Sequence, residues 1–388
     1  MTTNDKHDNI DDDDERANPM AWLAAELRTI KERQGDTKWL ETVPPTRKYL
    51  LSITTDGNHR GVLAAGRVAF LVSAGGVGKS HALCQLALAV AVADNQQKEK
   101  EKAGKAEASA STQWLGTFKV DIGGRVLLIM GEEEEEEIKR RLYDAAQVMG
   151  LSDIDKKLAA TNIVPMGLAG RADLALTKVL APGEESETET AFSSTFRARL
   201  KSEKWACIII DPLSRFAGGD VEKDNSAATR MVQVLEKFSH LQGNPTIVVA
   251  HHTRKAPRGD STGAVEADDV RGASALKDGA RFVAVLEDME RVDEKAPRHV
   301  RLRVVKNNYG TFPPAVVLTR VESAGGALRK ASDAERDAYE KAKDDAKAAK
   351  KADDKGRQKE KEKAGKAKAS ATDDDDKNHD GGDWGGDA

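Results

Sequence analysis

The sequence predicts an α/β fold with a mostly parallel central sheet, and three observations support this prediction. Short apolar segments of the length of buried strands alternate along the chain with longer segments of helical periodicity. A glycine-rich turn joins the first of these strands to an apolar helix. Near the end of the alternating region, residues 299–305 and 315–321 alternate in polarity, which predicts a C-terminal β-hairpin.

The individual elements follow from local composition. Strands are expected at the apolar segments 67–73, 125–131, 162–166, 205–211, 245–250 and 282–287. Helices are expected at 80–97, 134–148, 191–203 and 227–241. The first helix is apolar almost all round over residues 81–93, so we expect it to be buried. Strands separated by helices predict a parallel sheet that is covered on both faces.

Charge is distributed unevenly along the 388 residues, although 61 Lys and Arg against 65 Asp and Glu leave a net charge of only −4. The acidic start and the Asp- and Gly-rich end have too little apolar surface to fold, so disordered charged tails are expected. Residues 330–371 are almost entirely Ala, Lys, Asp and Glu, which indicates a solvated, partly helical tail. The segment 98–111 recurs nearly unchanged at 359–372, either as low-complexity linker or as an arm that contacts nucleic acid or a partner.

The chain is therefore expected to have four regions. They are a disordered acidic N-terminus (1–18), an N-terminal helical docking segment (19–60), one α/β domain (61–329, with the insert 98–111) and a charged, largely disordered C-terminal tail (330–388). No apolar run is long enough to span a membrane, and the start has no secretory signal. Cys84 and Cys207 lie in apolar segments, as buried free thiols of a reducing compartment do. A cytoplasmic protein with no membrane partner is predicted.

The strongest local signal is the run SAGGVGKS, which lies between a predicted strand and a predicted helix and matches a Walker A loop. Glycines let the backbone wrap around phosphates, so that successive N–H groups and the helix N-terminus face the anion. Lys79 is expected to reach the β- and γ-phosphates of ATP, and the Ser80 hydroxyl to bind Mg²⁺. Ser73 departs from the pattern, which normally begins with Gly. The expected nucleotide-binding residues are Ser73, Ala74, Gly75, Gly76, Val77, Gly78, Lys79 and Ser80.

Polar residues follow three further strands, where α/β sheets place their ligands. Asp211 ends an apolar strand in the Walker B pattern and is a candidate for Mg²⁺, with a turn-capping Asp as the alternative. Glu132 opens a run of six Glu residues and is the candidate base that activates the attacking water, whereas residues 133–137 fit a solvated helix start. His251 and His252 are candidate phosphate sensors, with a core histidine as the alternative for each.

Several cations allow two interpretations each. Arg140 and Arg141 could pair with the Glu run, or Arg141 could reach the phosphate of a neighbouring subunit. Lys306, at the tip of the predicted hairpin, could be solvated or could act across an interface in the same way. The loop that begins with Arg254, Lys255 and Arg258 is a candidate for neutralising DNA phosphates, and a solvated mobile loop is the alternative.

The ordered set of motifs resembles the RecA-like hexameric helicases, and most closely the RepA-like replicative helicases. The set runs SAGGVGKS, GEEEEEEIKRRL, IIIDPLSRF, VVAHHTRK, VRGASALKDGARF and VVKNNYG. The resemblance implies a RecA-like P-loop NTPase core that forms a ring around single-stranded DNA. It also implies a catalytic role for Glu132, a Walker B role for Asp211 and a double-histidine role for His251 and His252. Arg141, Arg271 and Lys306 correspond to cations that act on the neighbouring subunit's nucleotide, although Asn308 stands where DnaB-type proteins have arginine.

The leading functional hypothesis is an ATP-dependent DNA helicase or translocase of plasmid- or phage-type replication. It would need ATP and Mg²⁺, act on single-stranded DNA as a homo-oligomer, expected to be a hexameric ring, and could have a replication-initiator or primase partner. The alternative is a RecA- or KaiC-like ATPase regulator, or a recombination-associated ATPase, without strand-separating activity. A nucleotide-dependent DNA-binding module without catalysis is disfavoured, because a pure binder does not need the base Glu132.

Overall fold

The computed structural model describes residues 23, 26–30, 34, 38–103, 112–179, 189–219, 221, 223–252, 274–291 and 296–372. The chain divides into two compact units, Met1–Arg47 and Lys48–Ala388. The described part of the first unit contains the short helix α3 (Lys38–Glu41). All of the elements discussed below belong to the second unit.

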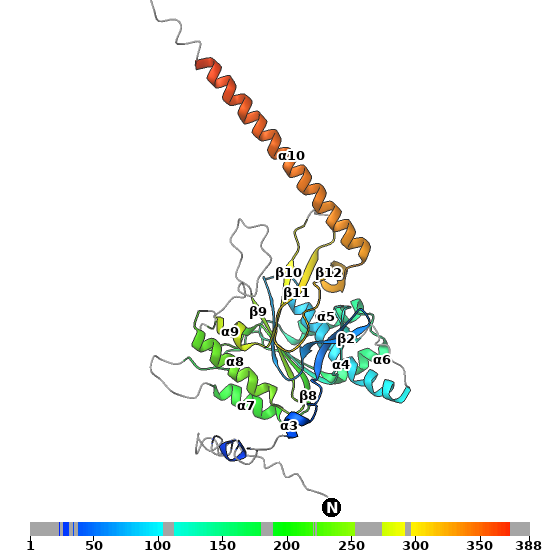
Figure 1. Cartoon of the computed structure of the whole chain (residues 1–388). Coiled ribbons are helices and arrows are strands. Elements are labelled where there is room, and N and C mark those ends of the chain that lie inside the picture. Colours follow the sequence, from blue (N-terminus) through cyan, green and yellow to red (C-terminus); the bar gives the residue numbers. More distant parts are fainter. Residues whose placement is uncertain are drawn as a thin grey trace, which may run out of the picture. The chain divides into compact units, whose positions relative to one another are not determined.

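The second unit is built on a nine-stranded sheet (Figure 1). Its parallel part has the order β7, β6, β8, β9, β3, β10, with bounds Ile163–Gly167, Arg125–Met130, Trp205–Asp211, Thr246–His252, Val68–Ser73 and Phe282–Asp288. The antiparallel strands β11 (His299–Asn307), β12 (Val316–Val321) and β13 (Ala327–Lys330) continue the sheet beyond β10. The predicted mostly parallel α/β fold with a C-terminal hairpin is thus confirmed.

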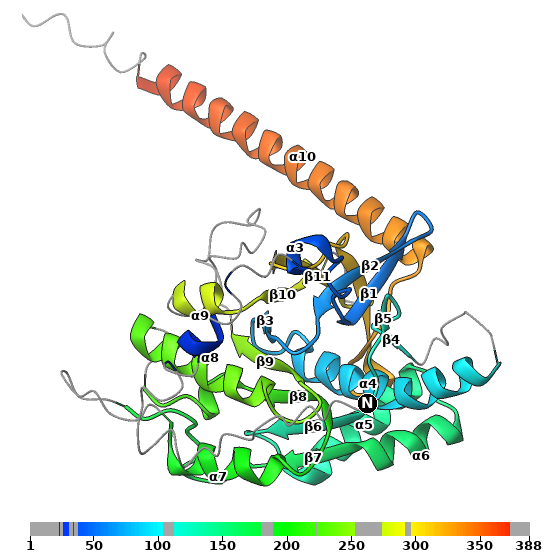
Figure 2. The same cartoon turned by 60° about the horizontal axis from the view of Figure 1, so that its bottom comes forward.

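Helices cover both faces of this sheet (Figure 2). One face carries α4 (Lys79–Ala103), α5 (Glu135–Val148) and α6 (Asp153–Asn162), and the other carries α7 (Ala191–Leu200), α8 (Asn225–Ser239) and α9 (Ser274–Gly279). Alternate residues of the strands supply two separate cores. On β6, Val126 and Leu128 pack into the core beside α4, whereas Leu127 and Ile129 pack into the core beside α8.

A second, four-stranded sheet was not predicted. It has the order β2 (Asn58–Ala64), β1 (Tyr49–Thr55), β5 (Phe118–Val120), β4 (Gln113–Trp114). The expectation of a helical docking segment up to residue 60 is therefore wrong for residues 49–60, which form a β-hairpin instead. The hairpin turns at Asp56 and Gly57, which have φ angles of 52° and 73°. An Asp-Gly pair with positive φ at both residues is a strong hairpin signal, and it was present in the sequence.

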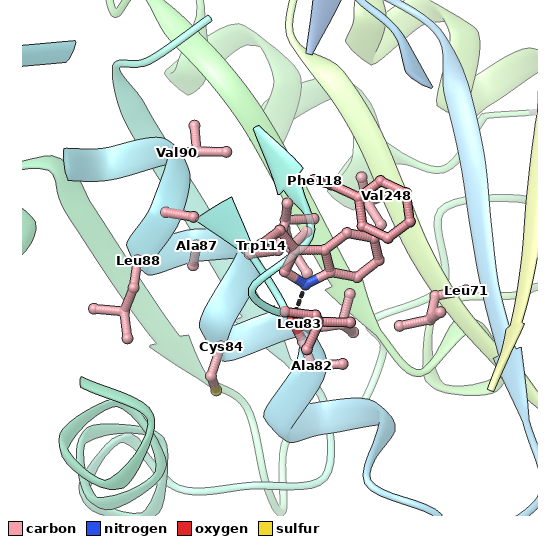
Figure 3. Close-up of a cluster of buried hydrophobic side chains, with 14 of the residues drawn as sticks. Leu71, Ala82, Leu83, Cys84, Ala87, Leu88, Val90, Trp114, Phe118 and Val248 are labelled. Atoms are coloured by element: carbon pink, nitrogen blue, oxygen red, sulfur yellow. Dashed lines mark hydrogen bonds between the residues drawn. The ribbon is translucent and has the colours of Figure 1, made fainter. Parts of the chain in front are cut away.

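Helix α4 is the buried centre of one core, as its apolar sequence predicts. Residues from Ala82 to Ala93 are all at most 4% exposed. Trp114 of the small sheet donates a hydrogen bond from Nε1 to the Ala82 carbonyl oxygen at 2.7 Å, and the centre of the Phe118 ring lies 5.6 Å from the centre of its indole (Figure 3). A buried indole needs such an acceptor, so this contact fixes the small sheet to the first turn of α4.

The C-terminal extension is helical where the structure describes it. Helix α10 covers Asp333–Thr372. This agrees with the expected partly helical tail over residues 330–371, and it differs from the expectation that most of the region 330–388 is disordered. The helix begins at a reciprocal cap: Ser332 N–H donates to Glu335 at 2.8 Å and Glu335 N–H donates to the Ser332 hydroxyl at 3.2 Å. None of the described helices combines the length and the apolar character that a membrane span requires.

Candidate active site

The glycine-rich loop joins β3 to α4 at the carboxyl edge of the parallel strands. Gly76 and Gly78 have φ angles of 76° and 113°, which side chains rarely allow. A Cβ atom built on Gly75 or Gly76 would meet nothing within 4 Å, so one side of the loop is open for a ligand. Ser73, where the motif normally has Gly, ends β3 in ordinary backbone conformation and donates from its hydroxyl to the Ala74 carbonyl oxygen at 2.9 Å.

Lys79, the first residue of α4, has its side chain directed along this edge of the sheet. Its Nζ lies 3.4 Å from the His251 carbonyl oxygen and 3.5 Å from His252 Nδ1, and the residue is only 7% exposed. Burial lowers the pKa of Lys79, and the negative charges of Asp211 and Glu132 oppose that shift. An ammonium group in this position can bind a further anion such as a phosphate.

Ser80 and Asp211 meet directly across the sheet. The Ser80 hydroxyl donates to Asp211 Oδ2 at 2.6 Å, and Asp211 is 6% exposed. A hydroxyl and a carboxylate are oxygen ligands of the kind that Mg²⁺ takes, so the two residues fit this ion. Among the described residues, no group of three His, Cys, Asp and Glu side chains could hold a metal alone. Mg²⁺ bound here would complete its shell with water and phosphate oxygens.

Glu132 lies beside Asp211 at the end of the neighbouring strand. The Gly131 N–H donates to the Asp211 carbonyl oxygen at 2.8 Å, and Glu132 follows with an exposed side chain. Arg215, in the short helix η2 (Leu213–Arg215), donates from Nε to the Gly131 carbonyl oxygen at 3.2 Å. This bond fixes the backbone from which the Glu132 carboxylate extends into solvent. An exposed, anchored carboxylate at this edge can accept a proton from water.

The two consecutive histidines of β9 point to opposite faces of the sheet, as strand geometry requires. His252 is the one whose ring nitrogen lies near Lys79 Nζ. The imidazole of His251 is 1% exposed and lies 6.4 Å from the ring of Phe70, a residue of the α8-side core. The geometry thus gives the two candidates different surroundings: His252 faces the phosphate loop and His251 lies in the core.

Arg141 is engaged within its own chain. Its guanidinium donates to Glu133 at 2.5 Å and to Glu137 at 3.1 Å, and its side chain is 19% exposed. Arg140 is more exposed and pairs with Glu137 alone, at 2.9 Å. Of the two interpretations that the sequence leaves open, pairing with the Glu run is the one present in this structure. A role of Arg141 toward a neighbouring subunit stays a prediction.

Lys306 is not at a hairpin tip, so that placement is wrong. It lies inside β11, opposite Val283 of β10, and the connection to β12 begins two residues later, with Asn308. Its Nζ donates to the carbonyl oxygens of Lys277 and Asp278 at 2.7 and 3.0 Å, at the end of α9. Partial burial lowers the pKa of Lys306. Sequence reasoning missed this because β11 continues to Asn307, beyond the apolar alternation that marked its expected end.

Four further candidates lie outside the described residues. They are the predicted DNA-contacting residues and the second arginine expected to act across an interface: Arg254, Lys255, Arg258 and Arg271. Each stays a prediction from the sequence.

Arg320 contacts the phosphate loop and was not a candidate. Located on β12, it donates from Nη1 to the carbonyl oxygen of Gly76 at 2.7 Å. Its position in an alternating strand gives no sign of this contact, which depends on how the antiparallel end of the sheet folds over α4.

A glycine-rich loop between a buried strand and a buried helix, with Lys79 and Ser80 facing Asp211 of a second strand, defines a P-loop ATPase. The AAA domain family model matches residues 26–258, more than half of the chain, and the chain belongs to this family. Among solved structures, the ATPase domain of another protein matches 69% of this chain and 85% of its own length, at 13% identity and a TM-score of 0.44. No curated protein matches the chain.

Proposed function

We propose that this ATPase is a DNA helicase or translocase that acts as a ring on single-stranded DNA in plasmid- or phage-type replication. The observation that carries the hydrolytic part is the convergence of Lys79, Ser80 and Asp211 at one sheet edge, with Ser80 Oγ and Asp211 Oδ2 2.6 Å apart. The DNA-directed part rests on the ordered set of motifs that resembles RepA-like helicases.

In the proposed reaction, each residue of the edge has one role. Lys79 binds the β- and γ-phosphates, and Ser80 and Asp211 hold Mg²⁺, which offsets phosphate charge when bound. Glu132 orients a water molecule and accepts its proton as the water oxygen bonds to the γ-phosphorus and the bond to the bridging oxygen breaks. His252, beside Lys79, is placed to donate a hydrogen bond to a phosphate oxygen.

Coupling of hydrolysis to DNA is proposed to run along β9. The strand ends at His252, and the basic residues Arg254, Lys255 and Arg258 follow directly in the sequence. A change in the contact between Lys79 and His252 on hydrolysis would therefore act on the first residues of the DNA-binding loop. Lysine and arginine in such a loop neutralise backbone phosphates without reading sequence, as a translocating enzyme requires.

Ring assembly would add cations from the neighbouring subunit, for which Arg141, Arg271 and Lys306 are the candidates. Two of them carry a condition set by this structure. Arg141 would have to leave Glu133 and Glu137, and Lys306 would have to leave the carbonyl groups at the end of α9. Arg271 lies outside the described residues.

The test combines hydrolysis, strand displacement and size. We expect the full-length protein to hydrolyse ATP faster with single-stranded DNA, to displace a strand from a tailed duplex, and to elute as a ring-sized oligomer with ATP and Mg²⁺. Lys79→Ala should abolish the first two activities. Hydrolysis that DNA does not stimulate, with no strand displacement, would refute the helicase proposal and favour a RecA- or KaiC-like regulator.

A further inference from the structure

We propose that Arg320 is a positioning residue of the phosphate loop, through which the C-terminal strands set nucleotide affinity. The inference rests on the proposed function, because it needs the loop to bind a nucleotide phosphate. Arg320 belongs to the same subunit as the phosphate loop and lies about 240 positions beyond it in the sequence. Its Nη1 donates a hydrogen bond to the Gly76 carbonyl oxygen at 2.7 Å.

This hydrogen bond constrains one peptide plane of the loop. The Gly76 carbonyl and the Val77 N–H belong to the same peptide unit, and that unit is trans. In a trans peptide the carbonyl and the N–H point in opposite directions. With the carbonyl held by Arg320, the Val77 N–H is directed away from the guanidinium. Gly76 has no Cβ, so rotation about its ψ, which turns this plane, would otherwise meet little steric resistance.

The Val77 N–H belongs to the run of backbone donors that a phosphate loop presents to its anion. Fixing its direction before the ligand arrives reduces the ordering that binding must supply, which is the general benefit of a preorganised site. The donor is a charged guanidinium, and charge-assisted hydrogen bonds are roughly twice as strong as neutral ones. Arg320 also polarises the peptide, so that the N–H is a better donor to an anion.

The guanidinium is itself partly enclosed by neighbouring residues. Its side chain is 16% exposed, and Glu322 Oε1 lies 3.6 Å from Nε. The turn after η4 (Glu322–Ala324) wraps around it: a Cβ built on Gly326 would lie 2.4 Å from Arg320 Nη2. Gly326 has a φ of 91°, a backbone conformation that favours glycine, and a side chain there would displace the guanidinium. The opposite residue on β13 is Leu328, whose side chain would be 3.4 Å from a Cβ on Gly78.

The arrangement therefore ties two glycines of the loop to one strand pair. The Gly76 carbonyl is bound by Arg320 of β12, and the Leu328 side chain of β13 occupies the space where a Cβ of residue 78 would point. A movement of β12 and β13 relative to α4 would act on the loop at both positions. This distinguishes Arg320 from arginines such as Arg298, whose guanidinium donates to the Asp288 carboxylate.

The test compares Arg320→Met and Arg320→Lys with a matched control, Arg329→Met. Arg329 lies on the adjacent strand β13 and pairs with Glu335 at 2.5 Å. The full-length proteins are titrated with fluorescent N-methylanthraniloyl-ATP and Mg²⁺, and KM and kcat for ATP are measured. We expect Arg320→Met to raise Kd and KM about tenfold, with kcat changed by less than about twofold. Arg320→Lys, which keeps a charged donor, should recover most of the affinity, and Arg329→Met should behave as the wild type.

Thermal unfolding without nucleotide separates positioning from folding. If Arg320→Met lowers Tm as well, Arg320→Lys remains the deciding variant: a folded Arg320→Lys protein with intermediate affinity supports the inference. If the wild-type protein binds the nucleotide and Arg320→Met binds it equally well, the inference is wrong and the proposed function stands. If the wild-type protein does not bind the nucleotide, the proposed function fails, and the inference fails with it.

Discussion

Gln85→Met tests how the nucleotide-binding helix is fixed to the C-terminal strands. Gln85 lies in α4, is 1% exposed, and donates from Nε2 to the Leu328 carbonyl oxygen at 2.6 Å. Its Oε1 accepts the Leu328 N–H at 3.1 Å. One side chain thus satisfies both backbone groups of a fully buried residue on β13. A Cβ built on Gly78 of the phosphate loop would lie 3.4 Å from the Leu328 side chain, so this residue also limits the space beside the loop.

The substitution removes both hydrogen bonds and keeps nearly the same side-chain length, so that little cavity forms. Each neutral hydrogen bond contributes about 1 kcal/mol net, and leaving a buried backbone group unsatisfied costs about 1–3 kcal/mol. For the two groups of Leu328 together we expect the free energy of unfolding to fall by about 3 kcal/mol. For a domain of this size that corresponds to a fall in Tm of roughly 6 °C.

The assay is urea and thermal unfolding followed by circular dichroism, with Gln147→Met as the matched control. Gln147 lies on α5 with its side chain exposed, so its replacement should change the free energy of unfolding by less than about 0.5 kcal/mol. Equal stabilities of Gln85→Met and Gln147→Met would refute the reasoning, because they would mean that β13 is not held to α4 through this amide.

The remaining predictions concern thiols, the α9 contact and the histidine pair. Burial raises the pKa of Cys84 to about 12 and also raises that of Cys207, so neither thiol should react with Ellman's reagent at pH 8 until urea is added. A native thiol that reacts at the rate of free cysteine would contradict this. Lys306→Met should lower the free energy of unfolding by about 1–3 kcal/mol, since two carbonyl groups lose a charged donor. Unchanged stability with a slower ATPase would instead indicate a role across a subunit interface. His252→Ala should slow ATP hydrolysis with little effect on Tm, and His251→Ala should lower Tm through the cavity it leaves beside Phe70, whereas the reverse pattern would overturn the assignment of faces.

The sequence was sufficient for the elements that rest on strong local patterns. The strand Trp205–Asp211 was predicted with its observed bounds, because an apolar run ending in a carboxylate leaves little ambiguity. The convergence of Ser80 and Asp211 followed from a rule of topology: carboxyl ends of parallel strands meet at one edge. Neither prediction needed any long-range side-chain contact.

Contacts between distant segments were beyond the reach of sequence patterns. Arg320 meets Gly76 only because the strand pair β12 and β13 is joined to α4 through Leu328 of β13, and nothing in its local alternation marks it. Lys306 looked like a solvated tip residue, but its Nζ satisfies backbone carbonyls of α9. The hairpin of β1 and β2 is a different case, since its Asp56-Gly57 turn was a local signal that the helical interpretation overlooked.

The most direct test of the central claim is the steady-state rate of ATP hydrolysis by the wild-type protein, Glu132→Gln and Glu134→Gln, with Mg²⁺. Both glutamates belong to one acidic run and both are exposed, but Glu132 lies two residues after the end of β6, next to the anchored Gly131. Glu134 is the N-cap of α5, and its side chain makes no capping bond. We predict that Glu132→Gln lowers kcat by about 10²-fold or more while ATP still binds, and that Glu134→Gln stays within about twofold of the wild type. A wild-type protein that hydrolyses no ATP, or a Glu132→Gln protein as active as the wild type, would contradict the proposed catalytic site.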